Sequence, residues 1–138
     1  MAFITFQPSD HFNNKEYAGT GSSQSITGVG FQPDLSWIKN YTSGSNYSHQ
    51  LYDATRGVTK YLQSNSTAGE TTNSNGLTAF GTDGFSVGTN AGVNSNGSTL
   101  ISWNWKANGQ GSSNTDGSIN TAYTSVNTTA GFSISKWT

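Results

Sequence analysis

The chain has 138 residues, charged side chains make up only 9% of them, and the net charge is −1. This charge balance argues against electrostatic binding to nucleic acid or to an anionic membrane, and the absence of Cys excludes disulfides and thiolate metal sites. No apolar run approaches the ~20 residues of a membrane span, and the first residues lack the basic start of an export signal.

Short alternating segments typical of strands recur along the chain, whereas no segment keeps a helical apolar period over three turns. In the first half, the predicted strands cover residues 25–27, 35–39, 50–52 and 59–63. In the second of these, Trp37 points away from the side of Ser36 and Ile38. A bend at residues 53–57 joins the last two strands.

The next predicted element is a hairpin, in which residues 76–80 and 85–88 flank a turn with the Asp-Gly sequence that hairpins favour. A polar loop over residues 90–97 follows. Residues 100–106 then form the clearest strand.

This clearest strand has one aromatic and one polar face. It puts Ile101, Trp103 and Trp105 on one side and Ser102, Asn104 and Lys106 on the other. We expect the aromatic face to form the middle of the core, and we expect Trp37 to be a core residue as well.

The C-terminal part divides into two segments after a body of residues 1–107. Residues 108–121 are predicted to be a polar linker, because the run NGQGSSNTDGS contains no large apolar residue. Residues 122–138 form a C-terminal strand segment with Phe132, Ile134 and Trp137 as its apolar positions. This segment could close the same sandwich, begin a further module or pair with a neighbouring molecule.

Spacing and composition together predict the fold. Strands at intervals of roughly 8–12 residues, separated by Gly, Asn and Asp, are typical of a β-sandwich or jelly roll. Ser, Thr, Asn and Gly make up just over half of the chain, so the core must be thin and rich in aromatic residues. We predict an all-β, antiparallel β-sandwich of jelly-roll or concanavalin-like type.

Four segments, in the same order, resemble a domain that recurs in structural proteins of marine bacteriophages. They are GVGFQPDLSWIKN from Gly28, SHQLYDATRGVTKYLQSN from Ser48, STAGETTNSNGLTAFGTDGFSVGT from Ser66 and TLISWNWKA from Thr99. The resemblance covers roughly residues 3–107, and the final AGFSISKWT resembles the opening of another such unit. It implies a concanavalin- or laminin-G-type sandwich in tail fibres, head decorations or other virion appendages, and it implies no catalytic residues.

The carboxylates give little support for catalysis. A glycosidase needs two carboxyl groups on either side of one bond, and the sequence brings no two of Asp53, Glu70 and Asp83 together. The Asp-Gly turn accounts for the presence of Asp83, and pairing with Arg56 accounts for that of Asp53. We therefore predict no catalytic residues and no enzyme.

Metal binding has equally weak support. His11 and His49 lack a second ligand at a recurrent spacing, so we predict no metal site of this kind. Ca²⁺ is the one ion that oxygen-rich loops near Asp83 or Asn94 and Asn96 could hold.

Four residues are candidate ligand-binding residues. Tyr41 and Tyr47 frame a loop that contains amide side chains and His49, and aromatic faces beside amides can hold a sugar. The alternative is that the two Tyr rings cover a thin core. Arg56, the only Arg, suits a sugar carboxylate, or it pairs within its own bend.

These observations favour a non-enzymatic virion structural protein that forms or decorates an exposed appendage by self-association, as a trimer or a filament. In this interpretation the C-terminal strand adds to the sheet of a neighbouring copy. The alternative is a carbohydrate-binding adhesion module that recognises host surface glycans. A polysaccharide depolymerase is a third possibility. The expected location is the virion or the extracellular space.

Overall fold

The computed structural model describes residues 6–137, and its strands form three antiparallel sheets. One sheet has the order β1 (Phe12–Ala18), β9 (Thr99–Trp105), β3 (Leu35–Asn40), β4 (Gln50–Asp53), β5 (Lys60–Leu62) and β6 (Thr71–Thr72). The second has the order β2 (Gln24–Thr27), β8 (Gly84–Val87) and β7 (Leu77–Gly81). The third has the order β10 (Ser112–Asn114), β11 (Thr121–Asn127) and β12 (Phe132–Lys136).

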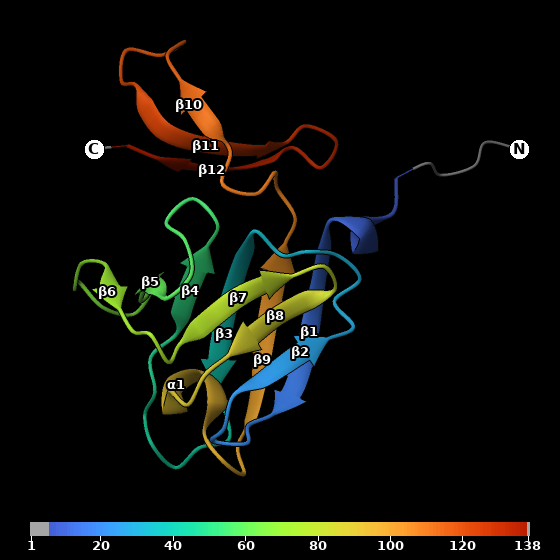
Figure 1. The fold of residues 1–138 in the computed structure, drawn as a ribbon, viewed down its shortest axis with the longest axis vertical. Coiled ribbons are helices and arrows are strands. Elements are labelled where there is room, and N and C mark those ends of the chain that lie inside the picture. Colours follow the sequence, from blue (N-terminus) through green and yellow to red (C-terminus); the bar gives the residue numbers. More distant parts are fainter. Residues whose placement is uncertain (1–5, 138) are drawn as a thin grey trace, which may run out of the picture.

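The first two sheets pack face to face as a β-sandwich, and the third lies across one end of it (Figure 1). The chain crosses from one layer of the sandwich to the other after β1, β2, β6 and β8. β1 and β9 come from opposite ends of the body and pair along their whole length, from Phe12 opposite Trp105 to Ala18 opposite Thr99. The predicted all-β antiparallel sandwich is confirmed.

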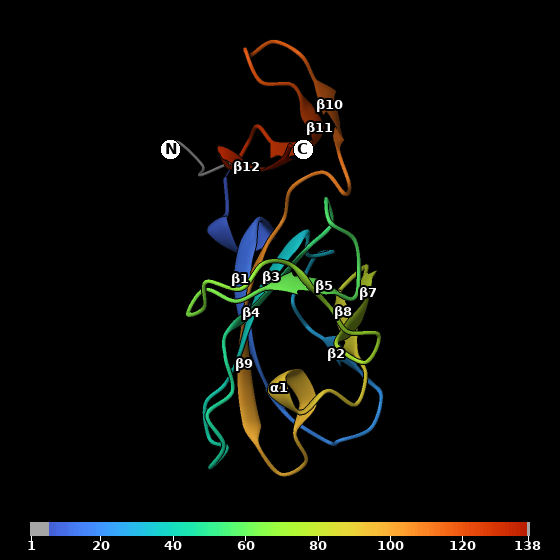
Figure 2. The ribbon, with the colours of Figure 1, turned by 90° about the vertical axis from the view of Figure 1, so that its left-hand side faces the viewer.

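The apolar core lies between the two layers, which Figure 2 shows from the side. The six-stranded sheet contributes Ile38, Tyr52 and Leu100, and the three-stranded sheet contributes Phe85 and Val87. All five are almost inaccessible to solvent. The core is thin and partly aromatic, as the composition predicts.

The prediction that the aromatic face of β9 forms the middle of this core is wrong. In β9 the buried residues are Leu100, Ser102 and Asn104, and the alternate positions, which include Trp103 and Trp105, are only half-buried on the opposite side. The sequence pattern divides the residues of β9 between its two faces correctly. The face with Ser102 and Asn104, however, points into the core, and the face with the Trp residues points outward.

Hydrogen bonding explains how small polar residues occupy the inner side of the central strands. Ser36 donates from its hydroxyl to Asn104 Oδ1 at 2.8 Å, and Asn104 Nδ2 donates to Ser102 Oγ at 3.0 Å and to the Asn13 carbonyl at 3.2 Å. Because these buried groups have partners, the polar cluster avoids the cost of unsatisfied groups. The prediction that Trp37 points opposite to Ser36 and Ile38 is confirmed, but Trp37 lies on the outer side.

The predicted hairpin is present as β7 and β8, with Phe80 opposite Phe85. The polar loop that follows contains one short helix, α1 (Ala91–Asn94), which the sequence did not indicate. Asn90 caps it by accepting a hydrogen bond from the backbone of Gly92. A second short helix, of 3-10 type, covers Pro8–Asp10. Neither of these described helices is long and apolar enough to cross a membrane.

The C-terminal residues form a sheet of their own. β10 lies inside the predicted linker and pairs with β11, so the polar run is partly a strand. β12, for which the sequence left three kinds of partner open, pairs with β11 of its own chain from Phe132 to Lys136. Gly111 makes the start of β10 possible, because its φ is +76° and a Cβ there would lie 2.1 Å from the Thr124 carbonyl oxygen.

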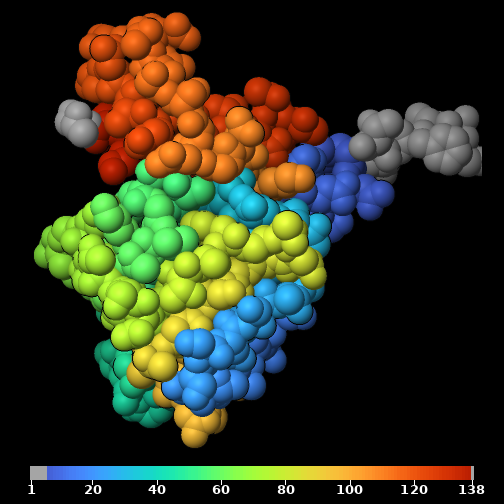
Figure 3. Space-filling view, viewed as in Figure 1, coloured from blue at the N-terminus to red at the C-terminus, as the bar shows by residue number. Residues whose placement is uncertain are grey.

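This C-terminal sheet touches the sandwich through a few specific contacts, and Figure 3 shows it seated on one end of the body. Asn127 Nδ2 donates to the Lys106 carbonyl at 3.0 Å, and Asn108 N donates to Ser125 Oγ at 2.8 Å. The ring of Phe132 stacks on Trp105, with centroids 6.1 Å apart.

Candidate functional site

The outer side of the six-stranded sheet carries two neighbouring Trp rings. Trp37 of β3 lies opposite Trp103 of β9. Their ring centroids are 5.8 Å apart and their planes are inclined by 59°. Both lie on the side that faces away from β2, β8 and β7, which is the left side in Figure 2. We call this surface the outer Trp face and define it by Trp37, Trp103 and the adjacent side chains of Lys39 and His49.

His49 fixes the orientation of the Trp37 ring. Trp37 Nε1 donates to His49 Nδ1 at 2.9 Å, and the two rings meet edge to face. Burial, together with the nearby charge of Lys39, lowers the pKa of His49 below its usual range. The imidazole is therefore neutral near pH 7, and because Nδ1 accepts from Trp37, its proton lies on Nε2. His49 is half-buried and immediately precedes β4.

A hollow of about 330 Å³ adjoins the outer Trp face where β3 ends. Tyr41 lines it and is 49% exposed, so this ring does not cover the core. The Tyr41 hydroxyl donates to Glu16 Oε2 at 2.6 Å, and this hydrogen bond raises the pKa of Tyr41. Tyr47 does not line the hollow, and its backbone carbonyl accepts a hydrogen bond from Lys39 Nζ. The remaining lining residues are Lys39, Asn40, Ser43, Gly44, Ser45 and Asn46.

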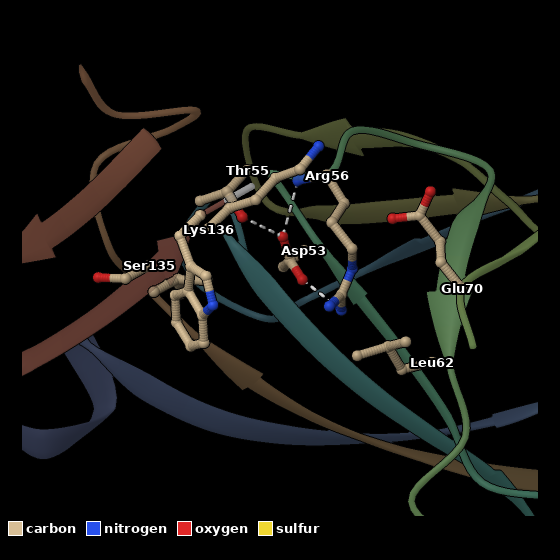
Figure 4. A pocket seen from close by; sticks show the side chains of 9 residues that line it. Asp53, Thr55, Arg56, Leu62, Glu70, Ser135 and Lys136 are labelled. Atoms are coloured by element: carbon tan, nitrogen blue, oxygen red, sulfur yellow. Dashed lines mark hydrogen bonds and ion pairs between the residues drawn. The ribbon is translucent and has the colours of Figure 1, made fainter. Parts of the chain in front are cut away.

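Arg56 lies elsewhere, in a cavity of about 270 Å³ between the sandwich and the C-terminal sheet (Figure 4). Its guanidinium forms an ion pair with Asp53, whose Oδ1 also accepts from Thr55 Oγ1 at 2.6 Å and from the backbone of Arg56 at 2.9 Å. Asp53 is 2% exposed, so the carboxylate is committed to its own bend. Arg56 therefore pairs within its own bend, which was the second of the two roles considered for it. It is not part of the surface around Tyr41.

The predicted assembly residues divide between two environments. Phe132 packs on Trp105, and Ile134 lines the cavity beside Arg56, so both side chains face their own sandwich. Trp137 also lines that cavity but is 64% exposed.

The carboxylates and histidines considered for catalysis or metal binding have other contacts. Glu70 lines the same cavity as Asp53, and its Oε1 lies 3.7 Å from Lys60 Nζ. Both oxygens of Asp83 accept backbone hydrogen bonds, from Gly28 at 2.9 Å and Gly30 at 2.7 Å. These two hydrogen bonds are the largest causes that lower the pKa of Asp83, first that from Gly28 and then that from Gly30. The charge of Lys15 lowers this pKa further.

The loop around Asn94 is similarly occupied. Asn94 Oδ1, which we considered as a ligand for Ca²⁺, accepts hydrogen bonds from the backbone of Thr20 and from Gln24 Nε2 instead. His11 Nδ1 lies 2.9 Å from Asn127 Nδ2. Within residues 6–137, no three His, Cys, Asp or Glu side chains come together as a metal site.

Comparison with known proteins gives a family but no activity. No curated protein and no solved structure matches the chain. Residues 7–138 match the model of a family described as Domain of unknown function (DUF7483). Because this match spans nearly the whole sequence, the chain belongs to that family.

Proposed function

We propose that the chain is a non-enzymatic structural module of an exposed assembly, such as a phage appendage, and that it self-associates through the open edge of β12. The observation that carries the proposal is this edge, which has a strand partner on one side only within residues 6–137. The phage setting is supported by the sequence resemblance alone.

The edge of β12 is long and nearly uncharged. None of the described backbone hydrogen bonds outside the sheets involves it, and Lys136 at its end is its only charged residue. β1 is also a long edge strand, but Lys15 and Glu16 lie in its middle. Charges on an edge oppose pairing with another chain, and an uncharged edge favours it. Of these two edges, β12 is therefore the more suitable for pairing with another chain.

The C-terminal sheet also lacks a core of its own. Among the described residues, the fully buried apolar side chains all precede β10, whereas Ile119, Val126 and Trp137 are between 39% and 67% exposed. A small sheet needs a buried face or more strands to be stable. A second copy supplies further strands, and the low charge of the chain keeps repulsion between copies small.

Two modes of pairing differ in the assembly that they build. If β12 pairs antiparallel with β12 of a second copy around Ile134, Ser133 lies opposite Ser135 of that copy, and a closed dimer results. If β12 pairs with a different edge, the contact repeats and gives a filament or a ring. The measured size of the assembly distinguishes these modes.

The proposal is tested by placing charge on the edge. Ser133 and Ser135 are exposed and alternate along β12 with Phe132 and Ile134, which contact the sandwich, so the double variant Ser133→Lys, Ser135→Lys leaves the contacts of Phe132 and Ile134 in place. In sedimentation velocity, the wild type should sediment as a dimer or larger species and the Lys variant as a monomer. The matched control, Ser133→Thr with Ser135→Thr, should behave like the wild type.

Two results contradict the proposal. One is a wild type that stays monomeric at its highest soluble concentration, and the other is a Lys variant that sediments like the wild type. Loss of assembly in Val126→Lys alone assigns the contact to the exposed face of β11. For the phage setting, mass spectrometry of purified particles should detect the chain, and its absence contradicts that part.

A further inference from the structure

We infer that the outer Trp face, with the hollow beside Tyr41, is a binding site for neutral saccharides. Sugar rings would stack their C–H faces on Trp37 and Trp103, and their hydroxyl groups would bond to the polar groups of the hollow. This site goes beyond the self-association proposed above and does not depend on it.

The first step is the environment of the Trp rings. Three of the four Trp residues lie on the outer side of the six-stranded sheet, but Trp105 is covered by Phe12, at 4.9 Å, and by Phe132. Trp37 and Trp103 are also half-buried, but among the described residues their only aromatic neighbours are each other and, for Trp37, the edge-on ring of His49. The hydrogen bond to His49 holds the Trp37 ring in place. A ring that is already fixed loses little freedom when a ligand stacks on it.

The second step is the continuity between the rings and the hollow. Along β3 and into the following loop, Trp37, Lys39 and Tyr41 are alternate residues on the same side of the sheet. Lys39 and Tyr41 line the hollow, so the aromatic and polar parts form one surface. The rest of the lining consists of Ser, Asn and Gly residues, whose hydroxyl, amide and backbone groups can both donate and accept.

The third step is the charge of this surface, which favours a neutral ligand. The ionised side chains of this surface near the hollow are Lys39 and Glu16, which carry opposite charges. Lys39 donates to the Tyr47 carbonyl, and Glu16 accepts from Tyr41, so neither is an open counter-ion for an anion. Arg56, the residue suited to a carboxylate, is paired with Asp53 at the other site.

A sugar suits these charges better than a flat protein surface does. Packing a second copy against this face would take both Lys39 and Glu16 out of water, and the cost of removing two charges from water can exceed the gain from pairing them. Sugar hydroxyls bond to both groups and leave part of their hydration in place.

The test is electrophoresis in native gels that contain a soluble polysaccharide. The neutral probes are a β-1,4-glucan, a β-1,3-glucan and a mannan, and the charged probe is alginate. We expect at least one neutral polymer to retard the wild type and to change its Trp fluorescence, without release of reducing ends. Trp103→Ala should weaken this binding by about tenfold or more, and Trp103→Phe, which keeps an aromatic ring, should retain most of it.

Trp105→Ala is the matched control, because it removes a Trp from the same strand and the same side where the ring is already covered. It should bind as the wild type does. The inference is overturned if no neutral polymer retards the wild type, if only alginate does, or if the two Ala variants lose binding equally. Dissociation of the assembly by Trp103→Ala, with no effect on retardation, assigns the face to a second copy and also overturns it.

The two proposals fail separately. The Lys substitutions on β12 should change assembly but leave binding per chain intact, whereas Trp103→Ala should change binding and leave assembly intact.

Discussion

Asn94 is the residue whose removal should show most clearly how the polar interior is stabilised. It is fully buried in α1 and makes four hydrogen bonds. Its Nδ2 donates to the carbonyls of Ser22 and Gly88, both at 2.7 Å, and its Oδ1 accepts from Thr20 N at 2.9 Å and Gln24 Nε2 at 2.7 Å. This one side chain therefore ties the loop before β2 to the end of β8.

The magnitude follows from these contacts. Each hydrogen bond contributes about 1 kcal/mol net, and the backbone groups left behind in Asn94→Ala are only partly accessible to replacement water. We therefore expect a loss of about 3 kcal/mol from a total of roughly 5–15 kcal/mol. For a chain of this size, that corresponds to a fall in melting temperature of about 10 °C.

The assay is urea unfolding followed by circular dichroism, with thermal unfolding as a second measurement. Asn96→Ala is the matched control, because Asn96 is exposed two residues away, and such surface changes stay within about 0.5 kcal/mol. If Asn94→Ala is as stable as Asn96→Ala, the polar interior does not stabilise the fold in the way described here.

Two further predictions concern the turns of the sandwich. The lowered pKa of Asp83 means that its contribution to stability is present above the unfolded pKa of ~3.9 and is lost as the pH falls through that value towards the folded pKa. The melting temperature of the wild type should therefore drop more between pH 5 and pH 2 than that of Asp83→Asn, and parallel curves would contradict this. Gly84 has a φ of +147°, and a Cβ there would lie 2.0 Å from the Ile26 carbonyl oxygen, so Gly84→Ala should cost about 2 kcal/mol or more in urea unfolding. Gly44→Ala, where a Cβ meets nothing within 4 Å, should cost far less, and equal losses would refute the clash.

The strands that the sequence predicts well are those with an apolar and a polar side. Residues 35–39 and 50–52 fall within β3 and β4, and the hairpin matches β7 and β8. β1 was missed because FNNKEYA is rich in Asn, Lys and Glu, which have low strand propensity. Its strand conformation depends on pairing with β9, a contact far away in sequence.

The orientation of the Trp residues could not be predicted, for a related reason. Alternation separates Trp103 from Ser102 and Asn104, but it does not say which side faces inward. Hydrophobicity alone favours Trp inside. The opposite arrangement is possible because Ser36, Ser102 and Asn104 bond to one another and to the backbone of β1. Such a network depends on three strands and is not visible in any single segment.

The structure does not bring all of the candidate binding residues together. Tyr41 and His49 lie beside the same surface, as their loop suggested, and the Trp rings adjacent to them were assigned to the core. For Arg56 the sequence left two roles open, binding of a sugar carboxylate and pairing within its own bend. The structure contains the pairing, with Asp53 three residues away in the chain.

Hydrogen exchange of the backbone amides of β12 at low and high protein concentration tests the proposed self-association most directly. The proposal predicts that alternate amides of Phe132–Lys136, those on the side away from β11, exchange freely in dilute solution and become protected as the concentration rises. The edge amides of β1 should exchange equally under both conditions. Protection of β12 that does not change with concentration would contradict the proposal.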